Sequence, residues 1–430
     1  MPVRLDSRAA DFSARFATLL ASKREASEEV GNAVAVILAD VQKRGDAAVI
    51  DYTARHDQLT LEPKTLRFSA EEIAAGAAAV TPEVRAALET AHERIRAHHE
   101  KQKPADSVYT DALGVTLGTL WTPIDAVGIY VPGGTASYPS SVLMNAVPAK
   151  VAGVPRIAMA VPTPRGVVNN AVLAAAQIAG IDEIYRVGGA QAVGALAYGT
   201  ETIAPVAKIM GPGNAYVAAA KRQVFGTVGI DMIAGPSEVL VIADSSANPA
   251  WVAADILAQT EHGGGAQGIL ITTDAALADA VEREVERQIA LLPRAEITRD
   301  GWEQFGAVIT VASLDEAAAL ANRIASEHVE LALDDPKALL PKIRNAGAIF
   351  LGHHTPEAIG DYVGGSNHVL PTARSARFAS GLGVLDFMKR TSLLGCDPTS
   401  LAALAGPAIT LAAVEGLDAH GRSVAIRLNR

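Results

Sequence analysis

Apolar residues in the first part of the chain recur at the three- and four-residue spacing of an amphipathic helix. One apolar stripe is formed by Val30, Val34, Ile37, Leu38 and Val41. Ser69 and Glu72 have the spacing of a capping box, and Thr81 is followed by a proline, two patterns that begin helices. Residues 1–105 are therefore expected to be helical.

From about residue 107 the pattern changes to short apolar runs separated by helical segments of roughly 10–18 residues. Strand-like runs lie near residues 127–131, 156–161, 184–187, 206–210, 238–243, 268–272, 307–311, 329–333 and 348–351. Strands that alternate with helices predict a mostly parallel sheet covered on both faces. Nine such runs are many for one sheet, so we expect an α/β fold with two units, the second completed by the helical N-terminal region.

After about residue 365 the alternation fails. Residues 366–396 look irregular with strand-like pieces, residues 398–420 have helical patterning, and residues 423–428 resemble a short closing strand. A tail with so little apolar surface of its own is expected to pack on something else, such as a second subunit.

Composition narrows the class of protein. The chain has 430 residues and a net charge of −10, and no basic run is long enough to neutralise a phosphate backbone, which argues against nucleic acid as a partner. Cys396 is the single cysteine, so no internal disulfide can form, which fits a reducing cytoplasm. The N-terminus lacks the apolar core of a secretory signal, and no stretch approaches the ~18 apolar residues of a membrane helix.

The sequence DILAQTEHGGG, residues 255–265, is the first candidate for chemistry. Gln259 and His262 are three residues apart near the end of a predicted helix, so both side chains project from one face. The glycines that follow end the helix and let another group approach the backbone closely. A neutral imidazole beside an amide oxygen could hold a metal ion or a polar substrate, although most such pairs are ordinary surface or core residues.

Other imidazoles and carboxylates could join this pair. His56, His92, His98 and His99 lie on the helical front and are interpreted as solvated, and His353 and His354 are adjacent in a loop, where side chains diverge. The remaining polar candidates near turns are His262, Glu327, His328, Asp361, His368, Glu415 and His420. Such nitrogen and oxygen donors suit zinc or a similar divalent ion, but their spacing alone does not establish that they meet.

Three strand-like runs end in glycine turns, at residues 131–134, 187–189 and 210–213, and each precedes a helical segment. Glycines at the carboxyl ends of parallel strands, next to helix N-termini, are where an open α/β sheet binds a nucleotide. Strand-to-helix turns also use glycine for purely structural reasons. None of the three turns is GxGxxG, so NAD would have to bind by a variant arrangement.

Seven longer motifs resemble the histidinol dehydrogenase family, and together they span most of the chain from residue 120 onward. They are GIYVPGGTASYPSSVLMNAVPAKVAGV at residues 128–154, RVGGAQA at 186–192, KIMGPGNAYVAAAKRQVFGTVGIDMIAGPSEVLVIAD at 208–244, LAQTEH at 257–262, SEHVEL at 326–331, GDYVGGSNHVLPTARSARFASGL at 360–382 and EGLDAH at 415–420. In this chain Gly263 follows His262, where the family would lead us to expect an acidic residue. Ser326 stands where proline or alanine is common.

The resemblance implies a specific set of site residues. Zinc would be held by Gln259, His262, Asp361 and His420, with the last contributed by the other subunit of a homodimer. Substrate contacts would fall on Ser237, His328, His368 and Glu415 as well as on the metal ligands. NAD contacts would fall on Tyr130, Gln191 and Asn214, and Glu327 and His328 would form the acid–base pair.

The resemblance also implies an architecture: two incomplete Rossmann-like parallel-sheet domains, a helical N-terminal region and a C-terminal tail intertwined with a partner. We expect an N-terminal helical arm at residues 1–26, a metal-carrying α/β domain built from residues 27–129 and 237–382, an NAD-binding α/β domain at 130–236, and a tail at 383–430 that packs on the partner subunit.

The implied reaction is the four-electron oxidation of L-histidinol to L-histidine through the aldehyde, with two NAD and one water, as the last step of histidine synthesis in the cytoplasm. His328 would accept the alcohol proton and Glu327 would activate water. Two other readings compete. A zinc- and NAD-dependent dehydrogenase of another small alcohol would not need His368, Glu415 and His420, and a non-catalytic binding protein would not need Glu327 and His328.

Overall fold

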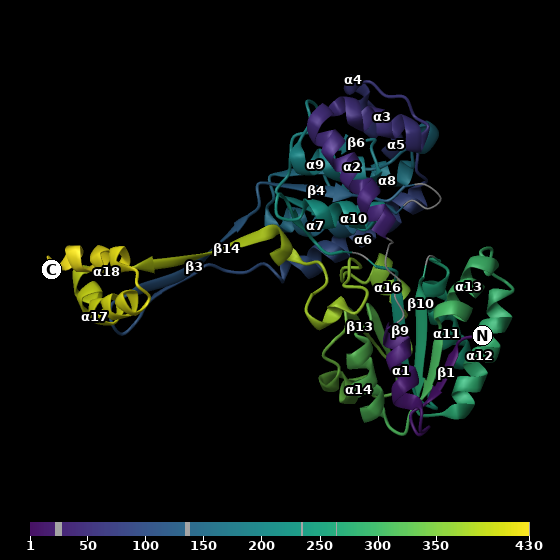
Figure 1. Ribbon diagram of the computed structural model, residues 1–430. Helices are drawn as coiled ribbons and strands as arrows, with labels where there is room; N and C mark the ends of the chain where they lie inside the picture. Colours follow the sequence, from purple (N-terminus) through teal and green to yellow (C-terminus); the bar gives the residue numbers. More distant parts are fainter. Residues whose placement is uncertain (22–27, 134–137, 234, 264, 430) are drawn as a thin grey trace.

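The computed structural model describes residues 1–21, 28–133, 138–233, 235–263 and 265–429. Two α/β units lie side by side, and a long arm carrying the C-terminus projects away from them (Figure 1). None of the described helices is both long and apolar enough to cross a membrane.

The first unit contains a five-stranded parallel sheet. Its strands are β4 (Ala126–Tyr130), β5 (Arg156–Ala160), β6 (Glu183–Tyr185), β7 (Lys208–Met210) and β8 (Gly229–Ile230), in the order β6-β5-β4-β7-β8. The connecting helices are α7 (Pro139–Ala152), α8 (Asn170–Ile178), α9 (Gly189–Tyr198) and α10 (Ala215–Val224). This is a Rossmann-like order without its sixth strand, and the order reverses between β4 and β7, where such sheets bind ligands.

The N-terminal helices pack on this five-stranded unit. They are α2 (Glu28–Arg44), α3 (Asp46–Asp57), α4 (Pro63–Leu66), α5 (Ala70–Ala78) and α6 (Pro82–Glu100). The apolar stripe of α2 lies in one buried cluster with α9, where Leu38 and Val41 lie so close to Gly194 that a side chain there would crowd them. Helices α5 and α6 pack on α8 and α7.

The second unit contains a six-stranded parallel sheet. Its strands are β1 (Val3–Asp6), β9 (Glu238–Ala243), β10 (Gln267–Thr272), β11 (Ala307–Thr310), β12 (His328–Ala332) and β13 (Ala348–Leu351), in the order β1-β11-β10-β9-β12-β13. Its helices are α1 (Phe12–Ala21), α11 (Pro249–Thr260), α12 (Ala275–Ile289), α13 (Ala295–Phe305), α14 (Leu314–Ile324), α15 (Pro336–Leu339) and α16 (Glu357–Tyr362). Strands β9 and β10 are buried throughout because helices cover both faces.

The arm is a ribbon that ends in two helices. Strand β3 (Thr116–Pro123) pairs antiparallel with β2 (Ser107–Thr110) and with β14 (Met388–Gly395), and the ribbon leads to α17 (Pro398–Val414) and α18 (Asp418–Ala425). Several large apolar side chains of the arm are exposed, among them Leu394, Leu411 and Val414. Figure 1 shows the arm extending well beyond both units.

The structure confirms the α/β class and all nine strand-like runs that the apolar pattern predicted. Three expectations were wrong. Residues 3–6 form a strand in the six-stranded sheet, where we expected only helix, and residues 423–428 are helical, where we expected a strand. His99 is buried and its Nδ1 lies 2.7 Å from the Ile95 carbonyl, so it is a core residue and not part of a solvated face.

The contacts also divide the chain differently from the expected domains. We expected residues 27–129 to complete the metal-carrying unit, but their helices pack on the five-stranded sheet, because the stripe of α2 fits the small residues of α9. The expected arm at residues 1–26 is part of the six-stranded unit, through β1 and the buried side chains of α1.

Substitution Phe16→Ala should therefore weaken the six-stranded unit. Phe16 is fully buried and stacks on Phe12 with ring centroids 5.5 Å apart. We expect the free energy of unfolding, measured by urea denaturation, to fall by about 3 kcal/mol or more. Phe378→Ala, at a ring that is 78% exposed, is the control. Equal effects of the two substitutions would mean that the N-terminal segment adds nothing to the unit.

Candidate active site

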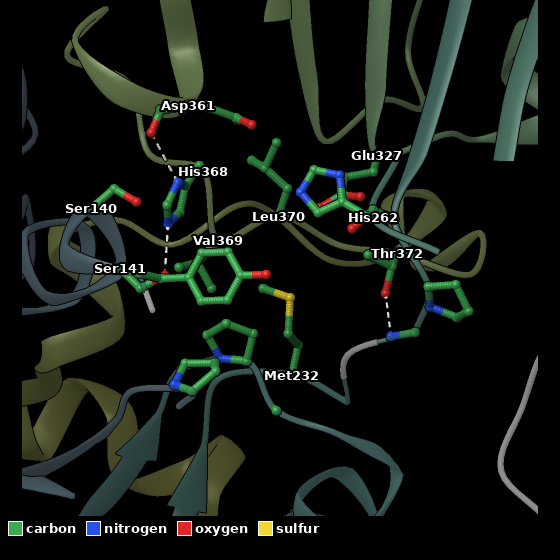
Figure 2. Close-up of a pocket in the computed structure, with 18 of the residues that line it drawn as sticks. Ser140, Ser141, Met232, His262, Glu327, Asp361, His368, Val369, Leu370 and Thr372 are labelled. Atoms are coloured by element: carbon green, nitrogen blue, oxygen red, sulfur yellow. Dashed lines mark hydrogen bonds between the residues drawn. The ribbon is translucent and has the colours of Figure 1, made fainter. Parts of the chain in front are cut away.

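A cavity of about 540 Å³ lies between the two units. The five-stranded unit lines it with turns at the carboxyl ends of β4 and β7 and with the start of α7. The six-stranded unit lines it with the end of α11, the start of β12 and the segment that follows α16. The carboxyl edge of one sheet therefore faces the amino edge of the other across the cavity, part of which Figure 2 shows.

Helix α11 brings Gln259 and His262 to the cavity, as their spacing predicted. The Nδ1 of His262 lies 3.2 Å from the Ala258 carbonyl oxygen and 3.3 Å from that of Gln259, so Nδ1–H donates to the backbone and Nε2 keeps its lone pair. Metal-ligating histidines commonly have such a backbone partner on the other ring nitrogen. The C-terminal end of α11 also carries partial negative charge, which favours a cation there.

The Gln259 amide is almost fully buried. With its nitrogen turned toward Glu357 it donates to both carboxylate oxygens, at 2.7 and 3.1 Å, and its oxygen accepts the Glu238 N–H at 3.3 Å. Gly263 follows with φ of 70°, a left-handed conformation that side chains rarely adopt, and an added Cβ would lie 2.6 Å from Ile297. The chain geometry therefore explains glycine at the position where the family resemblance suggested an acidic residue.

Asp361 and His368 face the cavity from α16 and the segment after it. The His368 Nδ1 lies 3.0 Å from the Asp361 backbone oxygen, and its Nε2 lies 3.4 Å from the Ser141 hydroxyl of the other unit (Figure 2). Burial lowers the pKa of His368. Burial opposes ionisation of Asp361, but His328 and the imidazoles of His368 and His262 together lower its pKa. This pair therefore offers a neutral imidazole beside an ionised carboxylate.

Glu327 and His328 lie buried at the start of β12. The His328 Nδ1–H donates to the Glu238 carbonyl at 3.0 Å. Its Nε2 has no hydrogen-bond partner among the described residues and lies 3.6 Å from Asp361 Oδ1. Burial lowers the pKa of His328, but the nearby carboxylates of Glu357, Glu327 and Asp361 raise it well above its usual value overall.

Burial raises the pKa of Glu327 to about 7, although His328 opposes the shift. Its Oε2 accepts the backbone N–H of Glu238 at 3.0 Å. A carboxyl group with a pKa near neutrality, next to a basic imidazole, can exchange a proton at physiological pH. The two residues therefore have the properties of an acid–base pair.

The predicted residues fall into two groups. Ser237, Gln259, His262, Glu327, His328, Asp361 and His368 line one cavity. Glu415 and His420 instead lie exposed on the arm, which Figure 1 shows directed away from both units. Within the described part of the chain, no three histidine, cysteine, aspartate or glutamate side chains are close enough to hold a metal ion. The cavity thus contains nitrogen and oxygen donors of the kinds that suit zinc.

The residues expected to contact NAD are spread around the five-stranded sheet's carboxyl edge. Asn214 lines the cavity and caps α10, with its Oδ1 accepting from Tyr216 and Val217 at 3.0 and 3.1 Å. Tyr130 and Gln191 are buried and are not among the residues that line the cavity, and the Tyr130 hydroxyl accepts the Gly189 N–H at 3.0 Å. Burial raises the pKa of Tyr130 to about 12, so it stays a neutral phenol.

The structure adds residues that the sequence did not single out. Glu357 contacts both Gln259 and His328, and its Oε2 lies 3.4 Å from His328 Nδ1. Burial raises the pKa of Glu357 to about 8, with His328 opposing. In the sequence, Pro356 before Glu357 indicates only the N-terminus of a helix. No spacing pattern connects Glu357 with His328 of β12, which lies 29 positions earlier.

A second pair of acidic residues, Asp255 and Glu330, lies next to Glu357. Glu330 on β12 hydrogen-bonds to Asp255 on α11, and its Oε1 accepts the backbone N–H of Glu357 at 2.8 Å. Burial raises the pKa of Asp255 to about 6, although the bond with Glu330 opposes the shift. Burial and the neighbouring Asp255 and Glu357 raise the pKa of Glu330 well above its usual value. Once Asp255 loses its proton at about pH 6, the two carboxyl groups share the one that remains.

This pair predicts how stability depends on pH. A carboxyl group with a raised pKa stabilises the fold below about pH 4, and that contribution is lost as the pH rises through about 6. The side chain introduced by Asp255→Asn cannot ionise. The free energy of unfolding of this variant, relative to that of the unsubstituted protein, should therefore rise by about 1–2 kcal/mol between pH 5 and pH 8, a range that allows for solvent screening of the partly buried group. Urea unfolding at the two pH values tests this, with Asp300→Asn, at an exposed side chain of α13, as control. Parallel pH profiles would contradict the shared proton.

Comparison with known proteins shows the family of the chain. The family model described as histidinol dehydrogenase matches residues 20–428. Histidinol dehydrogenase of Rhizobium meliloti is 65% identical over 429 residues, covering 100% of this chain and 99% of that protein, and the Mesorhizobium japonicum protein of the same name is 64% identical with full coverage of both. The crystal structure of histidinol dehydrogenase from Elizabethkingia anophelis superposes with a TM-score of 0.95 at 37% identity, covering 100% of this chain and 98% of that one. The chain belongs to the histidinol dehydrogenase family.

Proposed function

We propose that this chain oxidises L-histidinol to L-histidine at the cavity between its two units, with His328 and Glu327 moving the protons. Its family membership makes it an NAD-dependent oxidoreductase of the final step of histidine biosynthesis. The observation that carries the mechanism is the His328 Nε2 atom. It is buried in the cavity, has no hydrogen-bond partner in the described part of the chain, and lies next to carboxylates that increase its basicity.

The cavity fits a divalent cation. Gln259, His262 and Asp361, together with the partner subunit's His420, would hold zinc, which fixes the imidazole and amine of the substrate when bound. The donor types suit zinc, the helix C-terminus favours positive charge, and the His262 ring is held by the backbone so that Nε2 can ligate.

The alcohol step requires loss of a hydride and a proton from the carbinol group. His328 Nε2 accepts the hydroxyl proton, and the imidazolium that forms is stabilised by Glu357, whose Oε2 lies 3.4 Å from Nδ1. The Glu238 carbonyl holds Nδ1–H and so fixes the tautomer that leaves Nε2 free. NAD held at the edge of the five-stranded sheet would supply the hydride acceptor for both steps.

The aldehyde step requires one water. Glu327, with its pKa raised to about 7, takes a proton from that water as its oxygen adds to the carbonyl carbon. The carbonyl oxygen gains a proton to complete the hydrate, which then loses the one hydride left on its carbinol carbon and a hydroxyl proton to give the carboxylic acid, which ionises. One histidinol, one water and two NAD thus yield histidine, two NADH and three protons. His368, Ser237 and the partner subunit's Glu415 would hold the substrate through both steps.

A second copy of the chain completes the site in this proposal. The arm carries Glu415 and His420 away from the cavity of its own chain, and it exposes apolar side chains that a partner would cover. A metal site with donors from two subunits would account for the finding that, in the described residues of one chain, no three histidine, cysteine, aspartate or glutamate side chains are grouped to hold a metal ion.

The first experiment measures NADH and histidine formed per L-histidinol, with simple alcohols as comparison substrates. We expect two NADH per histidinol and little activity on the other alcohols. Activity on other alcohols alone would favour a dehydrogenase of different specificity, and no activity with zinc present would favour a binding protein.

The division of roles between the acid–base residues is tested by Glu327→Gln. Oxidation of added histidinaldehyde should fall by roughly 100-fold, more than oxidation of histidinol to the aldehyde, because general catalysis by one side chain contributes about that much. Stopped-flow NADH absorbance separates the two steps. Equal losses in both would show that Glu327 does not act selectively on water.

The shared site is tested by mixing two inactive variants. Glu327→Gln and His420→Ala impair different parts of the site, so a mixed dimer regains one intact site, and co-expression should restore about a quarter of the full activity. His420→Ala alone should also lose zinc on dialysis. The control pairs His420→Ala with Glu415→Gln, both on the arm, and no mixed dimer of these has an intact site. Failure of the first pair to complement would mean that each chain completes its own site.

A further inference from the structure

A buried ion pair lies in the wall of the cavity and has no part in the proposed reaction. Lys221 on α10 and Asp231, the residue after β8, contact each other with side chains only 2% and 1% exposed. Both line the cavity. A buried ion pair is weak evidence for stability, because the cost of removing two charges from water offsets their attraction. Its presence therefore calls for another explanation.

The pair holds both polar groups of a single glycine. The Gly211 N–H donates to Asp231 Oδ2 at 2.7 Å, and the Gly211 carbonyl accepts from Lys221 Nζ at 2.9 Å. Gly211 has φ of 107°, and an added Cβ would lie 2.1 Å from the backbone carbonyl oxygen of Tyr130. Its backbone is thus fixed by the ion pair on one side and by the end of β4 on the other.

Gly211 begins the turn that faces the cavity at the point where the strand order reverses. The turn continues through Pro212 and Gly213 to Asn214, whose side chain caps α10. The other oxygen of Asp231, Oδ1, accepts the Met232 N–H at 2.6 Å, where the chain leaves for the six-stranded unit. One ion pair therefore joins α10, the glycine turn and the connection between the units.

We propose that Lys221 and Asp231 are positioning residues for NAD. They hold the turn of residues 211–213 so that its backbone and the N-terminus of α10 meet the cofactor's diphosphate at a fixed distance from the connection to the other unit. Neither side chain has to touch the cofactor. The inference rests on the proposed function, because it assumes that NAD binds at this edge of the sheet.

The test is the double variant Lys221→Met with Asp231→Asn, in the full-length protein. It removes both charges together and keeps the side-chain shapes, but it leaves the Gly211 carbonyl without its donor. We expect the dissociation constant for NADH, measured by fluorescence titration, to rise about tenfold or more, as the loss of a buried hydrogen bond allows. Zinc content after dialysis and KM for L-histidinol at saturating NAD should stay within about twofold.

Asp231→Asn alone is the second variant, because it keeps an acceptor for the Gly211 N–H and is the milder change; it should weaken NADH binding by about threefold. Glu183→Gln is the matched control. It breaks the Arg156–Glu183 ion pair of the same unit, on partly buried side chains that do not line the cavity. It should lower thermal stability without changing NADH affinity.

The outcomes separate the inference from the proposed function. If the unsubstituted protein fails to bind NADH, the proposed cofactor site is wrong. If it binds NADH and both Asp231 variants bind equally well, the positioning role is overturned. If Glu183→Gln weakens NADH binding as much as the double variant, the effect reflects stability alone, and the positioning role is likewise overturned.

Discussion

The placement of one imidazole among buried carboxylates is the constraint on which the site depends. His328 is fixed through Nδ1 by the Glu238 carbonyl, and its ring lies within 4 Å of carboxylate oxygens of Glu357, Glu327 and Asp361. Buried anions are costly unless positive charge is near. In the proposed reaction, the imidazolium that forms when His328 accepts a proton supplies part of that charge, and a divalent cation beside Asp361 would supply more. Proton transfer and metal binding would then be parts of one electrostatic arrangement.

The facing sheet edges give the cavity two electrostatic sides. The five-stranded sheet presents its carboxyl edge, where α7, α9 and α10 begin, and helix N-termini favour the phosphates of a dinucleotide. The six-stranded sheet presents its amino edge, where α11 ends and its C-terminus favours a cation. In the proposed function, an anionic cofactor and a metal-held substrate would thus bind at opposite walls of one cavity. The hydride donor and acceptor would then face each other without any GxGxxG turn.

The sequence predicted the positions of the strands well, but it predicted poorly which helices and sheets pack against one another. Strands covered on both faces must be apolar throughout, so each appears as a short apolar run bounded by turns. The edge strand β1, with sequence VRLD, contains two charges and gave no such run. The stripe of α2 showed that one face is buried but not which sheet it meets, and residues 27–129 were placed with the wrong unit. His99 looked solvated because Arg96, Glu100 and Lys101 lie near it in the sequence.

The candidate site was predictable only as far as local spacing reaches. Gln259 and His262 share a helix face because they are three residues apart, and that part follows from the sequence. Their contacts with Glu357 and Glu238 depend on how α11, β9 and α16 pack, which no spacing along the chain encodes. The packing of the arm on another subunit is likewise not encoded by local spacing. Leu411 and Val414 are exposed beside Glu415, and apolar surface of this kind becomes favourable only when another chain covers it. In the proposed dimer, a second copy would cover this surface and so stabilise the fold. The same contact would bring His420 of one chain to the cavity of the other.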